Sequence, residues 1–283
     1  MRRLLTPDED FAPIRQPGPE DWLVAHPERG QTFDAFCDSA VVHPNPGRSV
    51  IYLIPLGSFP DDTSPPLEEL RLYTEAYFQL DVKVLAEFHP EPEQFWPRTN
   101  KHTHNRQVLT TAIMDFLYTQ LPPDAFCLLG VTMEDLYPDP SWNFVFGQAW
   151  PERRVGVYSF ARYDPAFSHK DRPADYRSLL FRRSCKVLAH EVGHLFGLHH
   201  CVYFDCLLNG SNSLAETDAA PAHLCPICLR KLRFAVQFDA VVRYRELSGF
   251  CHRHGWTDEA EWTDRQLAKA AEGDPVPSPA AER

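Results

Sequence analysis

The chain has 283 residues, and its 39 Asp and Glu against 28 Lys and Arg give a net charge of −11. This acidic balance argues against a broad nucleic-acid-binding face, which needs clustered basic side chains. The sequence has no apolar run of about 18 residues that could span a membrane, and residues 1–10 lack the roughly 7–15 apolar residues of a secretory signal. We therefore expect a cytoplasmic protein that acts without nucleic acid or membrane, and its oligomeric state stays open.

The two ends of the chain differ in composition from its middle. Residues 1–45 hold many prolines and show no periodicity, so we expect an irregular N-terminal extension with one short helix between residues 22 and 37. Residues 256–283 have few large apolar side chains, so we expect a largely disordered tail. Residues 46–255 are then expected to form a single domain.

Alternating strands and helices are predicted within this domain. The apolar pattern predicts strands at residues 49–56, 81–85, 126–132, 143–149 and 155–160, and helices at residues 65–80, 104–120, 176–198 and 229–247. The order strand, helix, strand, helix, strand at the beginning predicts an α/β sheet with crossover connections. The last two strands are expected to form a hairpin, with one of them at the edge of the sheet.

Residues 190–200 contain the pattern His-Glu-x-x-His-x-x-Gly-x-x-His. His190 and His194 share one face of a helix, where two imidazoles can bind one zinc ion at about 2.0–2.1 Å. A continuous helix would place His200 about 15 Å beyond His190 along the axis, so the helix must end and the chain must turn at Gly197. Three histidine ligands leave one zinc position open to water, which is the arrangement of a catalytic site.

Glu191 follows the first of these histidines and lies about 100° further round the helix. It can therefore reach a zinc-bound water without being a ligand, and it is the candidate general base for hydrolysis of an amide or peptide bond. His199 is one residue out of the pattern and is expected to point away. The alternative interpretation is a helix that carries these histidines by chance.

Four of the eight cysteines gather within 28 residues of sequence, at Cys201, Cys206, Cys225 and Cys228. Four thiolates bind zinc in a closed tetrahedral site at about 2.3 Å, so we predict a structural zinc and two zinc ions per chain. The alternatives are four buried free thiols or a redox Cys-x-x-Cys pair. Neighbouring side chains of an extended segment point in opposite directions, so His200 and Cys201 should face different metals.

Together these motifs resemble the archaemetzincin family of metzincin zinc metallopeptidases, and its vertebrate-type branch most. The resemblance covers roughly residues 46–250 and includes the segments 142–149, 160–163 and 224–232 as well as the histidine and cysteine motifs. It implies an α/β metzincin fold with a mixed twisted sheet, an active-site helix, a compact C-terminal part with the four-cysteine zinc and a C-terminal helix. It places the catalytic zinc on His190, His194 and His200, the base on Glu191, and the second zinc on the four cysteines.

One residue departs from the family pattern. Leu208 occupies the position of a methionine in the turn under the zinc, and because the two side chains have similar volumes we predict an intact site with slightly altered packing. By the same resemblance, residues 143–149 are the candidate edge strand that pairs with extended substrate. Tyr158, Tyr163 and Tyr203 are candidates for stabilising an oxyanion, although each fits a core or surface position better.

The predicted function is a zinc-dependent metallopeptidase that hydrolyses peptide or protein substrates by a zinc-bound water, which a glutamate base activates. The alternative is a zinc-binding protein on a metzincin scaffold that has little proteolytic activity and binds a peptide or a partner protein. A four-cysteine zinc module for nucleic acid is a third alternative, which the net charge of −11 disfavours. The substrate and its cleavage site do not follow from the sequence.

Overall fold

A five-stranded mixed sheet forms the centre of the fold in the computed structural model, which describes residues 2–39 and 43–272. Its strands lie in the order β2 (Val82–Val84), β1 (Val50–Leu56), β5 (Ala125–Thr132), β8 (Val155–Ser159) and β7 (Gly147–Trp150). All neighbouring pairs are parallel except β7 and β8, which form the predicted antiparallel hairpin. The mixed α/β fold class is therefore confirmed.

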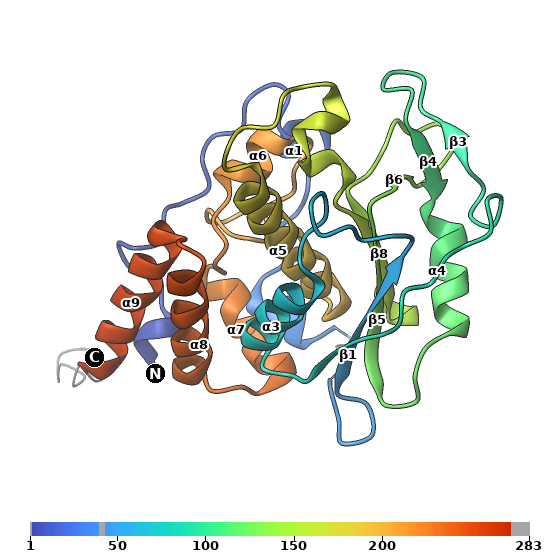
Figure 1. Cartoon of the computed structure of the whole chain (residues 1–283). Coiled ribbons are helices and arrows are strands. Elements are labelled where there is room, and N and C mark those ends of the chain that lie inside the picture. The colour runs from blue at the N-terminus through green and yellow to red at the C-terminus, as the bar shows by residue number, and fades with distance from the viewer. Residues whose placement is uncertain (1, 40–42, 273–283) are drawn as a thin grey trace.

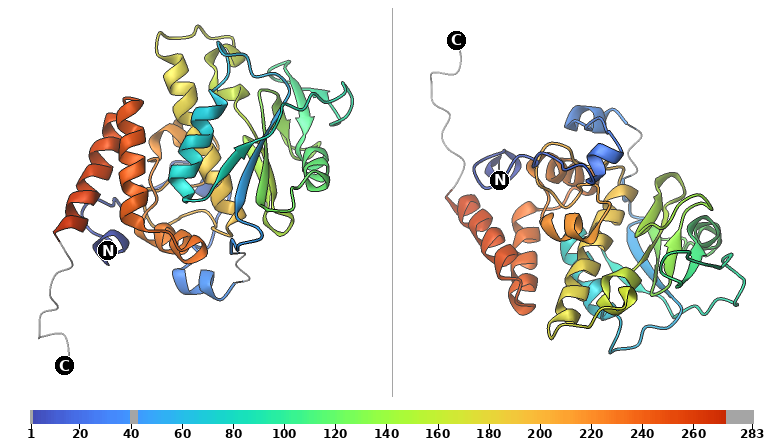
Figure 2. Two further views of the ribbon diagram at one scale, coloured as in Figure 1. Left: turned by 60° about the horizontal axis from the view of Figure 1, so that its bottom comes forward. Right: turned by 90° about the horizontal axis from the view of Figure 1, so that it is seen from above.

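Helices cover both faces of this sheet (Figure 2). Helices α3 (Leu67–Phe78) and α5 (Tyr176–Leu195) pack on one face, and α4 (Thr110–Thr119) packs on the other. Alternate residues of β1 face the two sides, so Ile51 and Leu53 join the core with α3 and α5, while Tyr52 and Ile54 join the core with α4. This double burial explains why β1 and β5 are continuous apolar runs.

A smaller three-stranded sheet lies beside the main one and was not predicted. It contains β3 (Arg98–Thr99), β4 (Arg106–Leu109) and β6 (Asp135–Tyr137). These strands are two to four residues long, too short for a periodic signal in the sequence. Short 3-10 helices complete this half of the molecule at η2 (Pro151–Arg153), η3 (Ala161–Tyr163) and η4 (Pro165–Ser168).

The C-terminal part is helical, with α6 (Leu214–Ala219), α7 (Pro226–Val236), α8 (Ala240–Arg253) and α9 (Thr257–Ala271) (Figure 1). The single helix predicted over residues 229–247 is wrong, because Gln237 ends α7 in the left-handed conformation and the Asp239 side chain caps α8. Among the helices of residues 2–39 and 43–272, none combines the length and the apolar composition that crossing a bilayer requires.

The predicted disordered tail over residues 256–283 is wrong for the part that the structure describes. Helix α9 packs along α8, and it buries Trp256, Ala260 and Trp262. The Trp262 ring stacks on His223 with the ring centres 3.6 Å apart, and Glu259 accepts hydrogen bonds from His223 and from a backbone N–H group. Residues 273–283 lie outside the described residues.

The N-terminal residues extend across much of the molecule. The chain starts at η1 (Arg2–Leu5) beside α7 and α9, and runs to α1 (Trp22–Ala25), which Figure 1 shows next to α6. A second short helix, α2 (Phe33–Cys37), packs on α7. Two short helices therefore stand where one was expected between residues 22 and 37.

Candidate active site and metal centres

Helix α5 carries the first two histidines of the predicted triad and ends in a glycine turn. Gly197 has a φ of +82°, and its N–H donates to the carbonyl of His194 at 2.8 Å. The N–H of Leu198 donates to the carbonyl of Gly193 at 3.2 Å. This pair of bonds reverses the chain at the end of a helix, and a left-handed residue between them favours glycine. The reversal returns His200 to the other two histidines, as predicted.

The three imidazoles converge so that one ligand atom from each lies within 4.8 Å of the others. The Nε2 atoms of His190 and His194 are 3.0 Å apart. The Nδ1 atom of each ring is hydrogen-bonded to an oxygen: His190 to the carbonyl of Leu207 at 2.9 Å, His194 to the carbonyl of Leu198 at 2.7 Å, and His200 to Glu28 Oε1 at 2.8 Å.

These bonds define the tautomer of each ring. Carbonyl and carboxylate oxygens only accept, so each Nδ1 carries a proton, and the Nε2 atom of a neutral ring is left with a lone pair. Loss of solvation lowers the pKa of His194 to about 3 and that of His190 well below its usual value, so both rings are neutral at pH 7. Neutral imidazoles with an oriented Nε2 fit a zinc ion.

Glu191 lies next to the histidines and against β7, the edge strand of the sheet. A Cβ atom at Gly147 would lie 3.0 Å from Glu191 Oε1, so a glycine at this position leaves room for the carboxylate. Burial raises the pKa of Glu191 to about 8. The carboxyl group therefore lies in a desolvated place beside the histidine cluster, where a bound cation would lower its pKa and favour the carboxylate form.

A cleft of about 420 Å³ opens above these residues. Glu191 and the three histidines line it together with Gly147, Gln148 and Ala149 of β7. Within the described part of the chain, β7 pairs only with β8, so its outer edge is free along the cleft. The predicted edge strand is therefore present from Gly147 onward, whereas residues 143–146 line the cleft as irregular chain.

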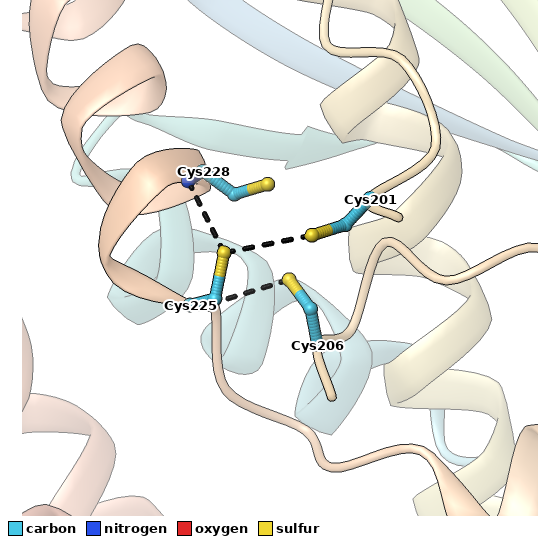
Figure 3. Close-up of side chains that lie close together, drawn as sticks. All are labelled: Cys201, Cys206, Cys225 and Cys228. Atoms are coloured by element: carbon cyan, nitrogen blue, oxygen red, sulfur yellow. Dashed lines mark hydrogen bonds between the residues drawn. The ribbon is translucent and has the colours of Figure 1, made fainter. Parts of the chain in front are cut away.

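The four clustered cysteines form a second, separate group (Figure 3). Their sulfur atoms lie within 4.8 Å of one another, and all four side chains are buried. The Cys201 and Cys225 sulfurs are 3.6 Å apart, too far for the roughly 2.05 Å of a disulfide bond, and all eight cysteines of the chain are free thiols. Four convergent sulfurs match the donor set of a tetrahedral zinc. His200 and Cys201 belong to different groups, as expected.

The segment 201–209, which contains the first two cysteines, connects the two groups. Asn209 donates to the carbonyls of Cys201 and Phe204 at 2.7 and 3.0 Å and accepts from the N–H of Cys206 at 2.8 Å. The carbonyl of Leu207 in the same segment accepts from His190. A displacement of the cysteines would therefore also displace the carbonyl that orients His190.

Other predicted candidates lie away from the cleft. Tyr158 and Tyr163 are fully buried and their hydroxyls have no hydrogen-bond partner, and neither these two nor Tyr203 is among the described residues that line the cleft. His199 is exposed and outside the histidine cluster. Two residues near the histidines could not be identified from the sequence, Glu28 and Trp22, because neither belongs to a local sequence motif. Trp22 lies in the wall of the cleft.

A helix with two histidines placed to share a metal ion, a third histidine after a glycine turn, and an open cleft along an edge strand define a zinc metallopeptidase. The model of peptidase family M54 matches residues 110–234. Archaemetzincin-2 of Homo sapiens is 41% identical over 275 residues, which cover 87% of this chain and 76% of that protein. The chain belongs to the archaemetzincin family of zinc metallopeptidases.

Further relatives extend the comparison. Archaemetzincin-1 of Mus musculus is 34% identical over 265 residues, which cover 84% of this chain and 52% of that protein. The crystal structure of archaemetzincin from Methanopyrus kandleri is 30% identical with a TM-score of 0.52, and the match covers 69% of this chain and 99% of that one. The smaller archaeal protein is therefore matched almost completely, while nearly a third of this chain lies outside the match.

Proposed function

We propose that His190, His194 and His200 hold the catalytic zinc and that Glu191 is the general base for peptide-bond hydrolysis. The convergence of the three imidazoles, each oriented by a hydrogen bond at its Nδ1 atom, carries this assignment. When bound, zinc lowers the pKa of a water and polarises a carbonyl. Glu191 takes the proton of the attacking water on a carboxylate oxygen and transfers it to the leaving amine.

The substrate is a peptide or a protein, and we propose that it lies extended along β7. The free edge of β7 offers backbone donors and acceptors to an extended chain, as in β-strand addition. This placement brings a peptide bond next to the histidines and Glu191, because they line the same cleft as β7. Residues 46–255 are proposed as the catalytic domain, with residues 1–45 as an extension packed against it.

We also propose that the four cysteines hold a structural zinc, which gives two zinc ions per chain. Four sulfurs fill a tetrahedral zinc completely, so this site has no position for a substrate. Thiolate ligands must stay reduced, and all eight cysteines are free thiols. Both facts support a reducing compartment such as the cytoplasm.

A Glu191→Gln variant tests the catalytic assignment. We expect it to hydrolyse a peptide library at least about 100-fold more slowly than the parent, because the general base is lost while the zinc ligands remain. Zinc content, measured by elemental analysis, should not change. Glu261→Gln, an exposed position on α9, is the matched control and should keep full activity. Turnover by Glu191→Gln at the parent rate would refute the role of Glu191.

A further inference from the structure

We infer that Glu28 is a positioning residue for His200, and that residues 22–31 of the N-terminal extension are part of the active site. This inference rests on the proposed function, because it takes the three histidines as zinc ligands. Glu28 is separated from His200 by 172 residues of sequence. Nothing in the histidine motif itself points to this carboxylate.

The contact between Glu28 and His200 differs from those of the other two histidines. His190 and His194 donate to backbone carbonyls, whereas His200 donates to a carboxylate at 2.8 Å. A carboxylate is the stronger acceptor and carries a negative charge, so it raises the basicity of the opposite ring nitrogen and fixes the ring plane. Both side chains are mostly shielded from solvent, with 19% of His200 and 27% of Glu28 exposed.

Trp22 fixes the position of the Glu28 carboxylate beside His200. Its indole Nε1–H donates to the same Oε1 atom of Glu28 at 2.6 Å, and its ring meets the His200 ring edge-on with the centres 5.2 Å apart. The backbone N–H of Trp22 donates to Glu216 Oε1 of α6 at 2.9 Å. Because Trp22 also lines the cleft, the segment that orients His200 forms one wall of the substrate site.

Gln31 fixes the backbone of the turn that precedes His200. Its side-chain amide donates to the carbonyl of Gly197 at 3.1 Å, and its side-chain oxygen accepts from the N–H of His199 at 3.2 Å. The buried ammonium of Lys231 on α7 donates to that same side-chain oxygen at 3.0 Å and to the backbone carbonyl of Gln31. The extension therefore contacts both the turn before His200 and the His200 ring.

A purely structural role is the competing explanation, in which these contacts only attach the extension to the domain. The two explanations differ in what a mutation changes. A structural role predicts a lower free energy of unfolding with unchanged zinc affinity of the histidine site. A positioning role predicts weaker zinc binding at that site in a protein that is still folded.

The test measures the zinc dissociation constant of the histidine site in the full chain. A mild chelator first empties this site, and zinc is then titrated back against a zinc-binding dye in the parent, Glu28→Ala, Glu28→Gln and Glu20→Gln. Glu20→Gln is the matched control, an exposed carboxylate of the same extension. We expect Glu28→Ala to bind zinc about 10–100-fold more weakly, as is typical when a partner of a metal-bound histidine is removed.

Glu28→Gln keeps an oxygen that can accept from Trp22 and His200 but removes the charge, so its loss of affinity should be smaller. A circular dichroism spectrum verifies that each variant is folded. If Glu28→Ala is unfolded, the zinc dissociation constant of Glu28→Gln is compared with that of Glu20→Gln instead. A folded variant that binds zinc as tightly as Glu20→Gln overturns the inference. A parent that takes up no zinc at this site contradicts the proposed function instead.

Discussion

Leu208 lies directly beneath the histidine helix. It is fully buried, and its Cδ2 atom is 2.9 Å from the position of a Cβ on Gly193, between the two histidines of α5. Leucine and methionine have similar volumes, so we expect Leu208→Met to change the free energy of unfolding by less than about 1.5 kcal/mol and to keep its zinc.

Leu208→Ala leaves a cavity and should cost about 2–5 kcal/mol. Urea denaturation of both variants with zinc present measures these differences. Loss of zinc or collapse of stability in Leu208→Met would show that the site requires leucine here for a reason other than volume.

Gly147 limits where the Glu191 carboxylate can lie. A Cβ at this position would lie 3.0 Å from Glu191 Oε1 and 3.0 Å from the backbone carbonyl oxygen of Val157, so both the carboxylate and the backbone of the β7–β8 pair would have to shift. We expect Gly147→Ala to reduce kcat by up to about 100-fold, which is the loss for a misplacement of a reacting group by about 1 Å.

Steady-state kinetics together with zinc analysis measure this effect, since the zinc content should stay at the parent value. Gly249→Ala on α8 is the matched control, because the nearest atom to its added Cβ is the end of the Arg253 side chain at 3.6 Å. Unchanged kcat in Gly147→Ala would argue that the position of Glu191 is not critical.

The residues that converge in the site differ in how far sequence could predict them. The histidines and the glycine turn lie within eleven residues, where helix geometry alone dictates which side chains meet. Glu28 has no such signal, because a single glutamate in an irregular, proline-rich segment has no periodic partner. Its role depends on tertiary packing that brings residues 22–31 over the end of α5.

Helix α9 shows how composition misleads at the scale of an element. The low apolar content of residues 256–283 suggests disorder, but Trp256 and Ala260 near its start are four residues apart, as on one helical face, and the buried Trp262 lies beside them. Averaging over the whole segment hides this short apolar stripe. The stripe packs on α8 and on the segment that precedes Cys225, so α9 supports the C-terminal half of the fold.

A Trp262→Ala variant tests this support. The ring stacks on His223 and meets the rings of Phe11 and Tyr244 edge-on, with centres 5.6 and 5.7 Å away. We expect a loss of about 3–5 kcal/mol in the free energy of unfolding, which is typical for removal of a buried tryptophan. The exposed Glu261→Gln on the same helix should behave as the parent. Equal stability of Trp262→Ala would mean that α9 does not contribute to the fold.

The four cysteines connect a loop to helix α7, so we expect a substitution at one cysteine to affect both. Cys225 caps α7 with its sulfur and Cys228 lies in the first turn of α7, while Cys201 and Cys206 lie in the segment that orients His190 through Leu207. We expect Cys228→Ser to lose about one zinc per chain and to unfold at lower temperature. Its histidine site should also bind zinc more weakly.

Elemental analysis and thermal unfolding measure both effects. Cys37→Ser is the control, because Cys37 lies outside both groups of potential ligands. Full zinc content and parent stability in Cys228→Ser would contradict the proposal that the four cysteines hold a structural zinc.

At the scale of the whole molecule, the alternation of strands and helices was predictable because each long element has a strong apolar period. The strands β1 and β5 and the helices α3, α4 and α5 all correspond to predicted segments. The small sheet, the break between α7 and α8, and the path of the N-terminal extension were not. They depend on short elements and on contacts between residues far apart in the sequence.

The complete molecule joins two potential metal centres through residues 201–209 and covers one of them with the N-terminal extension. The most direct test of this account is a crystal structure of the zinc-loaded chain with anomalous diffraction recorded on both sides of the zinc edge. The account predicts one peak about 2.0–2.1 Å from the Nε2 atoms of the three histidines, with no fourth protein ligand, and a second peak amid the four sulfurs. Absence of the first peak, or a protein side chain as its fourth ligand, would contradict the assignment of a hydrolytic zinc.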